Sequence, residues 1–212
     1  MISCIIPAYN EEKFIKDVIE TLKKCEFIDE IIAVSDGSTD NTALIAESLN
    51  VNKVIQLEKN IGKAGAIFEG LKYAKGDIVI LVDADLRGLT EKNLYQLVKP
   101  ILENTADMTI GSGIPFVMNK FSGLRALRKW FLEKISKDFP DYFKSLEYNI
   151  ENELNTQAKI LGLRVKYIKM EGVRNVHKIK KYGLKEGLKR TLKMYLQLAL
   201  YPKKIRKRNG GS

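Results

Sequence analysis

The sequence is poor in the residues and segments that mark secreted and membrane-spanning proteins. Its 212 residues include only two cysteines, Cys4 and Cys25, which form neither a disulfide framework nor a metal-binding spacing. No apolar run reaches the about 18 residues of a transmembrane helix, and no signal-peptide pattern opens the chain. We therefore expect two reduced thiols and a cytoplasmic protein.

What the sequence does contain is enough apolar material for one folded domain, followed by a basic tail. Hydrophobic residues make up 45% of the chain, and neither an internal repeat nor a linker interrupts it. The formal net charge of +10 lies entirely in the tail, because residues 178–208 carry twelve lysines or arginines and one acidic residue. We predict a main domain over residues 1–183 and a basic helical tail over residues 184–212.

The tail has the pattern of a basic amphipathic helix. Leu184, Leu188 and Leu192 recur at helical spacing, followed by Tyr195 and Ala199, with lysines and arginines between them. Such a helix either binds an anionic surface, here at the inner face of the membrane, or packs on the main domain with its basic face in solvent. A contact within a homodimer is a further alternative. Few aromatic residues interleave with the basic ones, so we expect no nucleic-acid partner.

Three apolar segments each lead into a polar loop. Residues 2–6, 30–34 and 78–82 predict buried strands, and apolar residues at helical spacing follow the first two loops. Glu11 and Glu12 should lie in the first turn of the first helix. Strands that alternate with helices predict an α/β fold with a mostly parallel sheet. Because parallel strands end at the same edge, the three loops should meet there, where open α/β sheets bind ligands.

The third loop places two carboxylates, Asp83 and Asp85, directly after a strand. Hard oxygen ligands at this position suit Mg²⁺ or Mn²⁺ that carries the phosphates of a substrate. An aspartate-rich turn that merely ends the strand is the structural alternative. The single histidine, His177, follows a predicted short strand over residues 165–170 and could return to the same edge, although a lone histidine is more often a surface or packed residue.

Four motifs occur in a characteristic order along the chain. They are Pro7-Ala8-Tyr9-Asn10-Glu11-Glu12, Ser35-Asp36-Gly37-Ser38-Thr39-Asp40, Asn60-Ile61-Gly62-Lys63-Ala64-Gly65 and Asp83-Ala84-Asp85. Together they resemble the GT-A family 2 glycosyltransferases, in particular the branch with glucosyl-3-phosphoglycerate synthase and the catalytic domain of dolichyl-phosphate mannose synthase. The resemblance is strong over residues 2–112 and looser to about residue 183. It implies a GT-A fold, with a Rossmann-like, mostly parallel central sheet flanked by helices.

The resemblance also implies an activity and a set of site residues. The activity is the metal-dependent transfer of a hexose from a UDP- or GDP-linked sugar to a small phosphorylated or polyprenyl-phosphate acceptor. Mg²⁺ or Mn²⁺ would be held by Asp83, Asp85 and His177. The donor would contact Pro7, Ala8, Tyr9, Glu11, Asp36, Lys63, Asp83 and Ala84. A carboxylate accepts from the N–H of a base, and a lysine is a compact charge suited to phosphate, so the residue types fit these roles. Lys63 as a solvated residue at a helix start is the alternative.

Two later segments match the family less closely. Ser122, Gly123 and Arg125 match its acceptor region, and they are expected to open a helix whose glycine and arginines form an anion site. A capped helix with solvated arginines is the alternative. Glu151, on a helix that starts near Tyr148, would lie near the reacting sugar or acceptor and would be the base if the reaction inverts. With Asp85 and Lys63, it makes up the expected catalytic set.

Two other functions compete with this interpretation. One is a catalytically idle GT-A-like protein that binds a membrane or nucleic acid. The other is a nucleotidyltransferase, which would usually show a glycine-rich phosphate loop with a lysine near the first strand, where this chain has Pro-Ala-Tyr-Asn. The chain also lacks the Gln-x-x-Arg-Trp motif of processive family 2 synthases, which argues against polymer synthesis.

Overall fold

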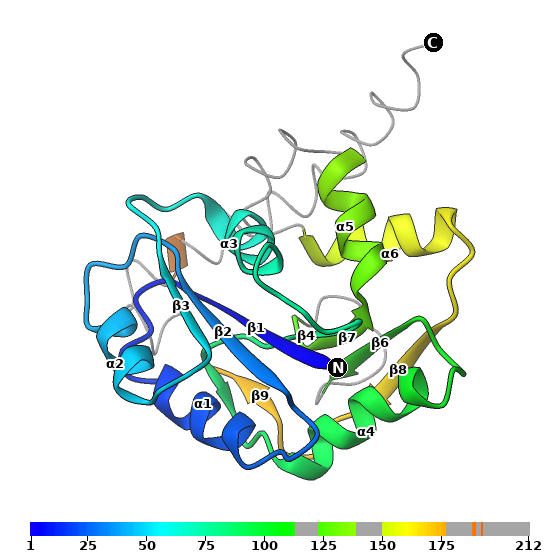
Figure 1. Cartoon of the computed structure of the whole chain (residues 1–212), viewed down its shortest axis with the longest axis horizontal. Helices are drawn as coiled ribbons and strands as arrows, with labels where there is room; N and C mark the ends of the chain where they lie inside the picture. Colours follow the sequence, from blue (N-terminus) through cyan, green and yellow to red (C-terminus); the bar gives the residue numbers. More distant parts are fainter. Residues whose placement is uncertain (113–122, 139–149, 177–187, 190–191, 193–212) are drawn as a thin grey trace. The chain divides into compact units, whose positions relative to one another are not determined.

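The computed structural model describes residues 1–112, 123–138, 150–176, 188–189 and 192. The chain divides into two compact units, residues 1–175 and 176–212. The first unit has an α/β fold (Figure 1). The predicted boundary at residue 183 lies outside the described residues, as does nearly all of the predicted tail helix. Within the described part of the chain, no helix is long and apolar enough to cross a membrane.

The first unit is built on a seven-stranded sheet with the order β3-β2-β1-β4-β7-β6-β8. The strands are β1 (Ile2–Ala8), β2 (Glu30–Ser35), β3 (Lys53–Gln56), β4 (Ile78–Leu81), β6 (Met108–Ser112), β7 (Arg125–Arg128) and β8 (Val165–Lys169). All pairings are parallel except those of β7, which runs antiparallel to both β4 and β6. A separate two-stranded ribbon joins β5 (Leu86–Arg87) to β9 (Arg174–Asn175). The predicted mostly parallel sheet is confirmed.

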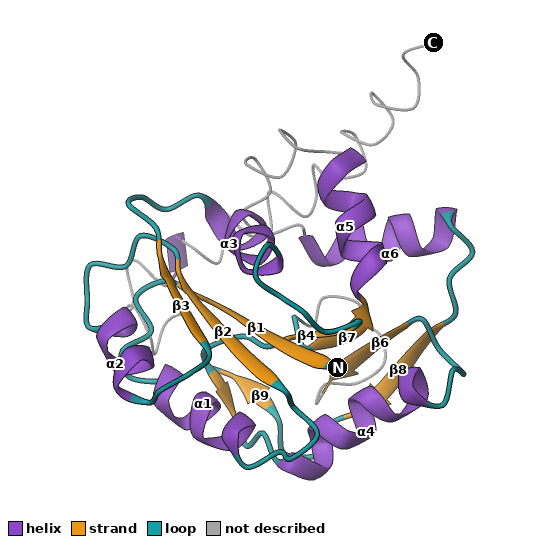
Figure 2. Cartoon of the chain, in the orientation of Figure 1, coloured by secondary structure: helices purple, strands orange, loops and turns teal. Residues whose placement is uncertain are grey.

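Helices cover both faces of this sheet (Figure 2). They are α1 (Ile15–Lys23), α2 (Thr42–Ser48), α3 (Gly62–Leu71), α4 (Glu91–Leu102), α5 (Lys129–Asp138) and α6 (Ile150–Ile160). Alternate strand residues face opposite sides, so they contribute to two separate apolar clusters. One cluster packs against α1, α2 and α4, and the other against α3, α5 and α6. Both cysteines are buried and unbridged, as expected.

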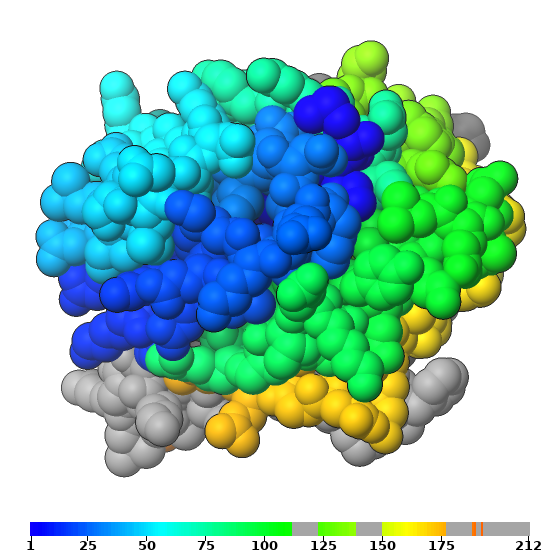
Figure 3. Space-filling model, turned by 60° about the horizontal axis from the view of Figure 1, so that its bottom comes forward, coloured from blue at the N-terminus to red at the C-terminus, as the bar shows by residue number. Residues whose placement is uncertain are grey.

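On the first of these faces α1 lies beside α4 (Figure 3). The rings of Phe27, just after α1, and Tyr95, in α4, meet edge to face with centroids 5.8 Å apart. Helix α4 begins at a capping box, in which Thr90 and Asn93 each satisfy a backbone N–H of the other. This cap fixes where the chain turns after the loop that carries Asp83 and Asp85. The loop is therefore anchored on both sides, by β4 and by α4.

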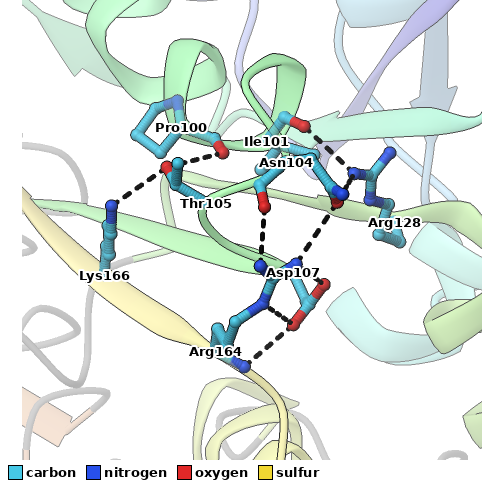
Figure 4. A network of polar contacts seen from close by, with 8 residues as sticks. All are labelled: Pro100, Ile101, Asn104, Thr105, Asp107, Arg128, Arg164 and Lys166. Atoms are coloured by element: carbon cyan, nitrogen blue, oxygen red, sulfur yellow. Dashed lines mark hydrogen bonds and ion pairs between the residues drawn. The ribbon is translucent and has the colours of Figure 1, made fainter.

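A polar network ties the amino ends of β6 and β8 to the end of α4 (Figure 4). The guanidinium of Arg164 donates to both carboxylate oxygens of Asp107, at 3.0 and 2.9 Å, and to the carbonyl oxygen of Asn104 at 2.6 Å. Arg128, at the end of β7, donates to the Asn104 side chain at 3.0 Å. This network lies at the edge of the sheet opposite to the carboxyl ends of β1, β2 and β4, so we assign it a structural role.

Two details of the predicted elements were wrong. The segment that starts at Ser122 was expected to open a helix, but residues 125–128 form β7, and α5 begins only at Lys129. Pairing with β4 on one side and β6 on the other places this short segment in the middle of the sheet, and this tertiary context outweighs its local helical pattern. Helix α1 begins at Ile15, so Glu11 and Glu12 lie in the turn before it rather than in its first turn.

Candidate active site

The centre of the site is a lysine held between two carboxylates. Lys63 lies in the first turn of α3, and its Nζ is 2.6 Å from Asp83 Oδ1 and 2.6 Å from Glu151 Oε1. The three side chains are only 24%, 16% and 12% exposed. Burial by itself would lower the pKa of Lys63, but the two carboxylates more than offset it and hold that pKa above its ordinary value. Lys63 is therefore a charged ammonium, and its solvated alternative is excluded.

Gly123 makes room for this group of charges. A Cβ at position 123 would lie 2.5 Å from Lys63 Nζ and 2.6 Å from Asp83 Oδ1, which is closer than real Cβ atoms approach other heavy atoms. Gly123 leads into β7, whose first residue, Arg125, pairs with Leu81 at the end of β4. Any side chain at position 123 would thus push the lysine and the aspartate apart. The structure places Gly123 at the site, while the neighbouring Ser122 lies outside the described residues.

The two aspartates after β4 share a partner that the sequence analysis missed. Asn175 Nδ2 donates to Asp83 Oδ2 at 3.2 Å and to Asp85 Oδ1 at 3.4 Å. Asn175 is brought there by β9, where it pairs with Leu86 directly after the aspartate loop. No local sequence signal marks this asparagine, because the contact depends on a strand pairing about ninety residues away along the chain.

The donor set is suited to a hard divalent cation. The carboxylate oxygens of Asp83 and Asp85 at this edge are of the kind that Mg²⁺ and Mn²⁺ take in proteins. Among the described residues, no group of three His, Cys, Asp or Glu side chains comes together, and the third predicted ligand, His177, lies outside them. Asp83 and Asp85 share the Asn175 side chain, and their role as metal ligands stays a prediction, as does that of His177.

Arg125 is completely buried on the inner side of the site. Its guanidinium donates to Asn155 Oδ1 of α6 at 2.7 Å. Burial lowers the pKa of Arg125 to about 10, against the opposing effects of the negative charges on Glu151 and Asp83. The side chain thus links β7 to the helix that carries Glu151. Its predicted contact with an acceptor stays a prediction.

The loops after β1 and β2 form the other side of the site. Ala8 pairs with Ser35 at the strand ends, and the Ala8 carbonyl accepts from the Asp36 N–H at 2.8 Å. This pairing places Asp36 beside the loop that holds Pro7, Ala8, Tyr9 and Glu11. Glu11 is buried, and its N–H donates to Thr42 Oγ1 at 2.8 Å. The structure therefore brings both predicted donor loops to the same edge as Asp83 and Ala84.

Asp36 has a structural task in addition to its predicted role. Its carboxylate accepts from the backbone N–H groups of Ile61 at 2.7 Å and Gly62 at 3.0 Å, at the start of α3. Burial raises the pKa of Asp36, although these two hydrogen bonds act in the opposite direction. Asp36 thereby fixes the turn of chain that carries Lys63. Its predicted contact with the base of a donor is not tested by these bonds, because each carboxylate oxygen can accept more than one.

The sequence was compared with known proteins. The profile described as "Glycosyl transferase family 2" matches residues 3–168. An uncharacterized protein of Methanocaldococcus jannaschii is 32% identical over an alignment of 201 residues, and the match covers 80% of each chain. A UDP-N-acetylglucosamine–dolichyl-phosphate N-acetylglucosaminyltransferase of Methanococcus voltae is 38% identical over 133 residues, covering 54% of this chain and 52% of that protein. An undecaprenyl-phosphate 4-deoxy-4-formamido-L-arabinose transferase of Proteus mirabilis is 41% identical over 100 residues, but only 31% of its length is covered.

Solved structures agree in fold. The crystal structure of glucosyl-3-phosphoglycerate synthase from Mycobacterium tuberculosis, in complex with Mn²⁺, UDP and glucosyl-3-phosphoglycerate, superposes with a TM-score of 0.70. At 24% identity the match covers 83% of this chain and 72% of the other. The seven-stranded sheet, the loops at its carboxyl edge and the family profile over residues 3–168 together show that this chain belongs to glycosyl transferase family 2.

Proposed function

We propose that this protein transfers a hexose from a UDP- or GDP-linked sugar to a phosphorylated acceptor, either a small metabolite or a polyprenyl phosphate, with the help of Mg²⁺ or Mn²⁺. The observation that carries the proposal is the largely buried ammonium of Lys63 between Asp83 and Glu151, in a chain of this family. Relatives support the acceptor class, because two of them are transferases named for dolichyl or undecaprenyl phosphate. A solved neighbour holds glucosyl-3-phosphoglycerate together with Mn²⁺ and UDP.

The charges of the site suit the departure of a nucleoside diphosphate. A cation held by Asp85, with Asp83 and His177, would offset negative charge on the leaving diphosphate. Lys63 supplies a fixed positive charge at the same place, and its two carboxylate partners keep it protonated at neutral pH. Because the ammonium is already held by hydrogen bonds, little reorganisation is needed when charge develops during the reaction.

The position of Glu151 bears on the choice of acceptor. Its Oε1 accepts a hydrogen bond from Lys63 Nζ at 2.6 Å, so this oxygen is already engaged in holding the ammonium. An acceptor hydroxyl would need a base in an inverting reaction, whereas an ionised phosphate oxygen attacks without one. This geometry favours a phosphate oxygen as the nucleophile, with Glu151 orienting Lys63. Arg125 and Gly123, on the same side of Lys63, would then face the acceptor.

The test is a thermal-unfolding panel followed by a transfer assay. UDP- and GDP-sugars are added to the full-length protein with and without Mn²⁺, since a ligand that binds only the native state raises the melting temperature. We expect one nucleotide class to raise it, and to do so more strongly with Mn²⁺. The donors that bind are then assayed for transfer to 3-phosphoglycerate and to a polyprenyl phosphate in vesicles. Absence of a shift with every donor, with and without metal, would refute the proposal.

A further inference from the structure

The position of Asn175 beside the two aspartates is set by the ribbon of β5 and β9. Val173 and Leu86 are both buried in the apolar cluster that also contains α1 and α4. Gly88 and Gly172, which lie at the same end of the ribbon, have positive φ angles of 72° and 77°. The carbonyl of Gly172 fills the space where a Cβ on Gly88 would lie. The backbone at position 175 is therefore fixed by packing and by a tight glycine contact, and not by its hydrogen bonds to the aspartates.

The side chain itself is exposed, although it touches both carboxylates. Its terminal nitrogen is 3.2 Å from Asp83 Oδ2 and 3.4 Å from Asp85 Oδ1. Metal–oxygen bonds of about 2.1 Å in an octahedron place neighbouring ligand atoms about 3.0 Å apart. The distance from the end of the Asn175 side chain to each aspartate oxygen is thus close to the distance between two adjacent ligand atoms of one divalent ion.

The carboxamide of Asn175 can interact with this site in two orientations, one without a cation and one with a cation. Without a cation, the NH₂ group faces two negative oxygens and donates to both. A half-turn about the terminal torsion exchanges the NH₂ group for the carbonyl oxygen, and this oxygen is a neutral, hard ligand of the kind that Mg²⁺ and Mn²⁺ accept. The end of the Asn175 side chain can therefore bridge the two aspartates when no cation is bound, and it can offer an oxygen ligand when a cation is bound.

We propose that Asn175 is a ligand of the divalent cation at the Asp83–Asp85 site, through its carboxamide oxygen. This inference rests on the proposed function, because it assumes that a cation binds at these aspartates. The competing explanation is that the amide only bridges the two carboxylates and leaves when a cation enters. The two explanations predict opposite effects of removing the amide, because a ligand strengthens cation binding and a competing donor weakens it.

The experiment measures the affinity of the full-length protein for Mn²⁺, from the electron paramagnetic resonance signal of the free ion, with and without UDP. Asn175→Ala should weaken Mn²⁺ binding about tenfold or more, as loss of a group in a metal shell does. Asn175→Asp should bind Mn²⁺ at least as tightly as the wild type, because a carboxylate is a stronger hard ligand. The metal-free Asn175→Asp protein should melt at a lower temperature, since a third carboxylate then faces Asp83 and Asp85 in place of the amide donor.

Asn52→Asp is the matched control. It adds the same charge at the opposite edge of the sheet, where Asn52 Oδ1 accepts from the Ile31 N–H and an aspartate oxygen can do the same. This variant should leave Mn²⁺ affinity unchanged. Wild-type or tighter Mn²⁺ binding by Asn175→Ala would overturn the inference. Weaker Mn²⁺ binding by Asn175→Asp than by the wild type would overturn it too. If Asn175→Ala fails to fold, the Mn²⁺ affinity of Asn175→Asp decides.

Asp85→Ala separates this inference from the proposed function. If Asp85→Ala loses Mn²⁺ binding while Asn175→Ala keeps it, only the role of Asn175 is wrong. If Asp85→Ala also binds Mn²⁺ like the wild type, the assignment of the cation site to Asp83 and Asp85 is wrong. The proposed metal dependence is then refuted as well.

Discussion

Lys63 and Glu151 are 88 positions apart in the sequence, and their side chains meet at 2.6 Å in the candidate active site. The contact joins α3, on the side expected for the nucleotide, to α6, on the side expected for the acceptor. Because Lys63 also holds Asp83, a single ammonium connects the loop after β4 to α6. The loop proposed to hold the cation and the helix proposed to face the acceptor are therefore coupled through one charge.

The first prediction concerns that charge. Lys63→Met leaves Asp83 and Glu151 facing each other in a largely buried site, and removal of one partner of a buried ion pair costs about 3 kcal/mol of unfolding free energy. The matched control is Lys72→Met, in the residue that caps α3, where Lys72 pairs with Glu69 in solvent. The Lys72→Met control should lower the unfolding free energy by less than about 1 kcal/mol. Urea unfolding at neutral pH measures both.

The same pair gives a double-mutant test. In a Lys63→Met/Glu151→Gln protein a neutral amide replaces one of the two largely buried carboxylates. The second change should therefore recover part of the stability lost in Lys63→Met. The combined loss should then be clearly smaller than the sum of the single losses. Additive losses would mean that Lys63 and Glu151 do not interact in solution, and would remove the argument that Glu151 orients Lys63.

The second prediction concerns Asp36, which holds the start of α3. Asp36→Ala removes two hydrogen bonds from a charged acceptor, and one such bond contributes about 1.5–3 kcal/mol. We expect a loss of stability of at least that size and a higher dissociation constant for UDP. If Asp36 contacts the base, binding of pyrophosphate, which has no base, should change little. Equal losses for UDP and pyrophosphate would instead show that Asp36 acts by placing Lys63.

The sequence predicted the first half of the molecule better than the second. Strands β1, β2 and β4 are apolar runs that end in polar loops, and both faces of these three strands are buried, so the local pattern carries the tertiary information. These loops contain Asp36, Asp83 and Asp85, which is why most of the predicted site residues come together. The family motifs lie in the same stretch.

The remaining features depend on contacts between distant segments. Strand β7 is short and reads locally as a helix start, and only its position between β4 and β6 makes it a strand. The Lys63–Glu151 and Asn175–Asp83 contacts join residues 88 and 92 positions apart. No periodicity or spacing in one segment reports such a pair. A search for polar residues next to predicted edge ribbons would have brought Asn175 into consideration, but not its partners.

The third prediction concerns pH and the network at the amino edge of the sheet. The Arg164 guanidinium, which donates to Asp107, holds the pKa of that carboxyl below its ordinary value of 3.8. A carboxyl whose folded pKa is lowered stabilises the fold above its unfolded pKa, and the contribution disappears as the pH falls through the folded pKa. Asp107→Asn should therefore be less stable than the wild type at pH 7, and the difference should shrink steadily below about pH 4. Urea unfolding from pH 7 to pH 2 checks this. A difference that stays constant with pH would mean that packing of Asp107, and not its charge, matters.

The last prediction concerns the basic tail and separates a lipid-linked acceptor from a soluble one. A helix with Leu184, Leu188 and Leu192 on one face and basic residues between them should bind anionic vesicles, with each lysine near the surface adding about 1 kcal/mol. Full-length protein should co-sediment with anionic vesicles at low salt, less at high salt, and not with neutral vesicles.

The charge-reversed protein Lys185→Glu/Lys189→Glu/Lys193→Glu should lose this binding. The matched control, Lys72→Glu/Lys99→Glu/Lys134→Glu, changes the net charge equally, but on the surface of the first unit, and should keep most of the vesicle binding.

If the acceptor is a polyprenyl phosphate, the tail variant should bind donor normally yet transfer poorly on vesicles, because only its attachment to the surface is lost. If the acceptor is a small phosphorylated metabolite, transfer in solution should be equal in both variants. Failure of the wild type to bind anionic vesicles at low salt would end the membrane hypothesis and leave packing on the first unit or a homodimer contact as the role of the tail.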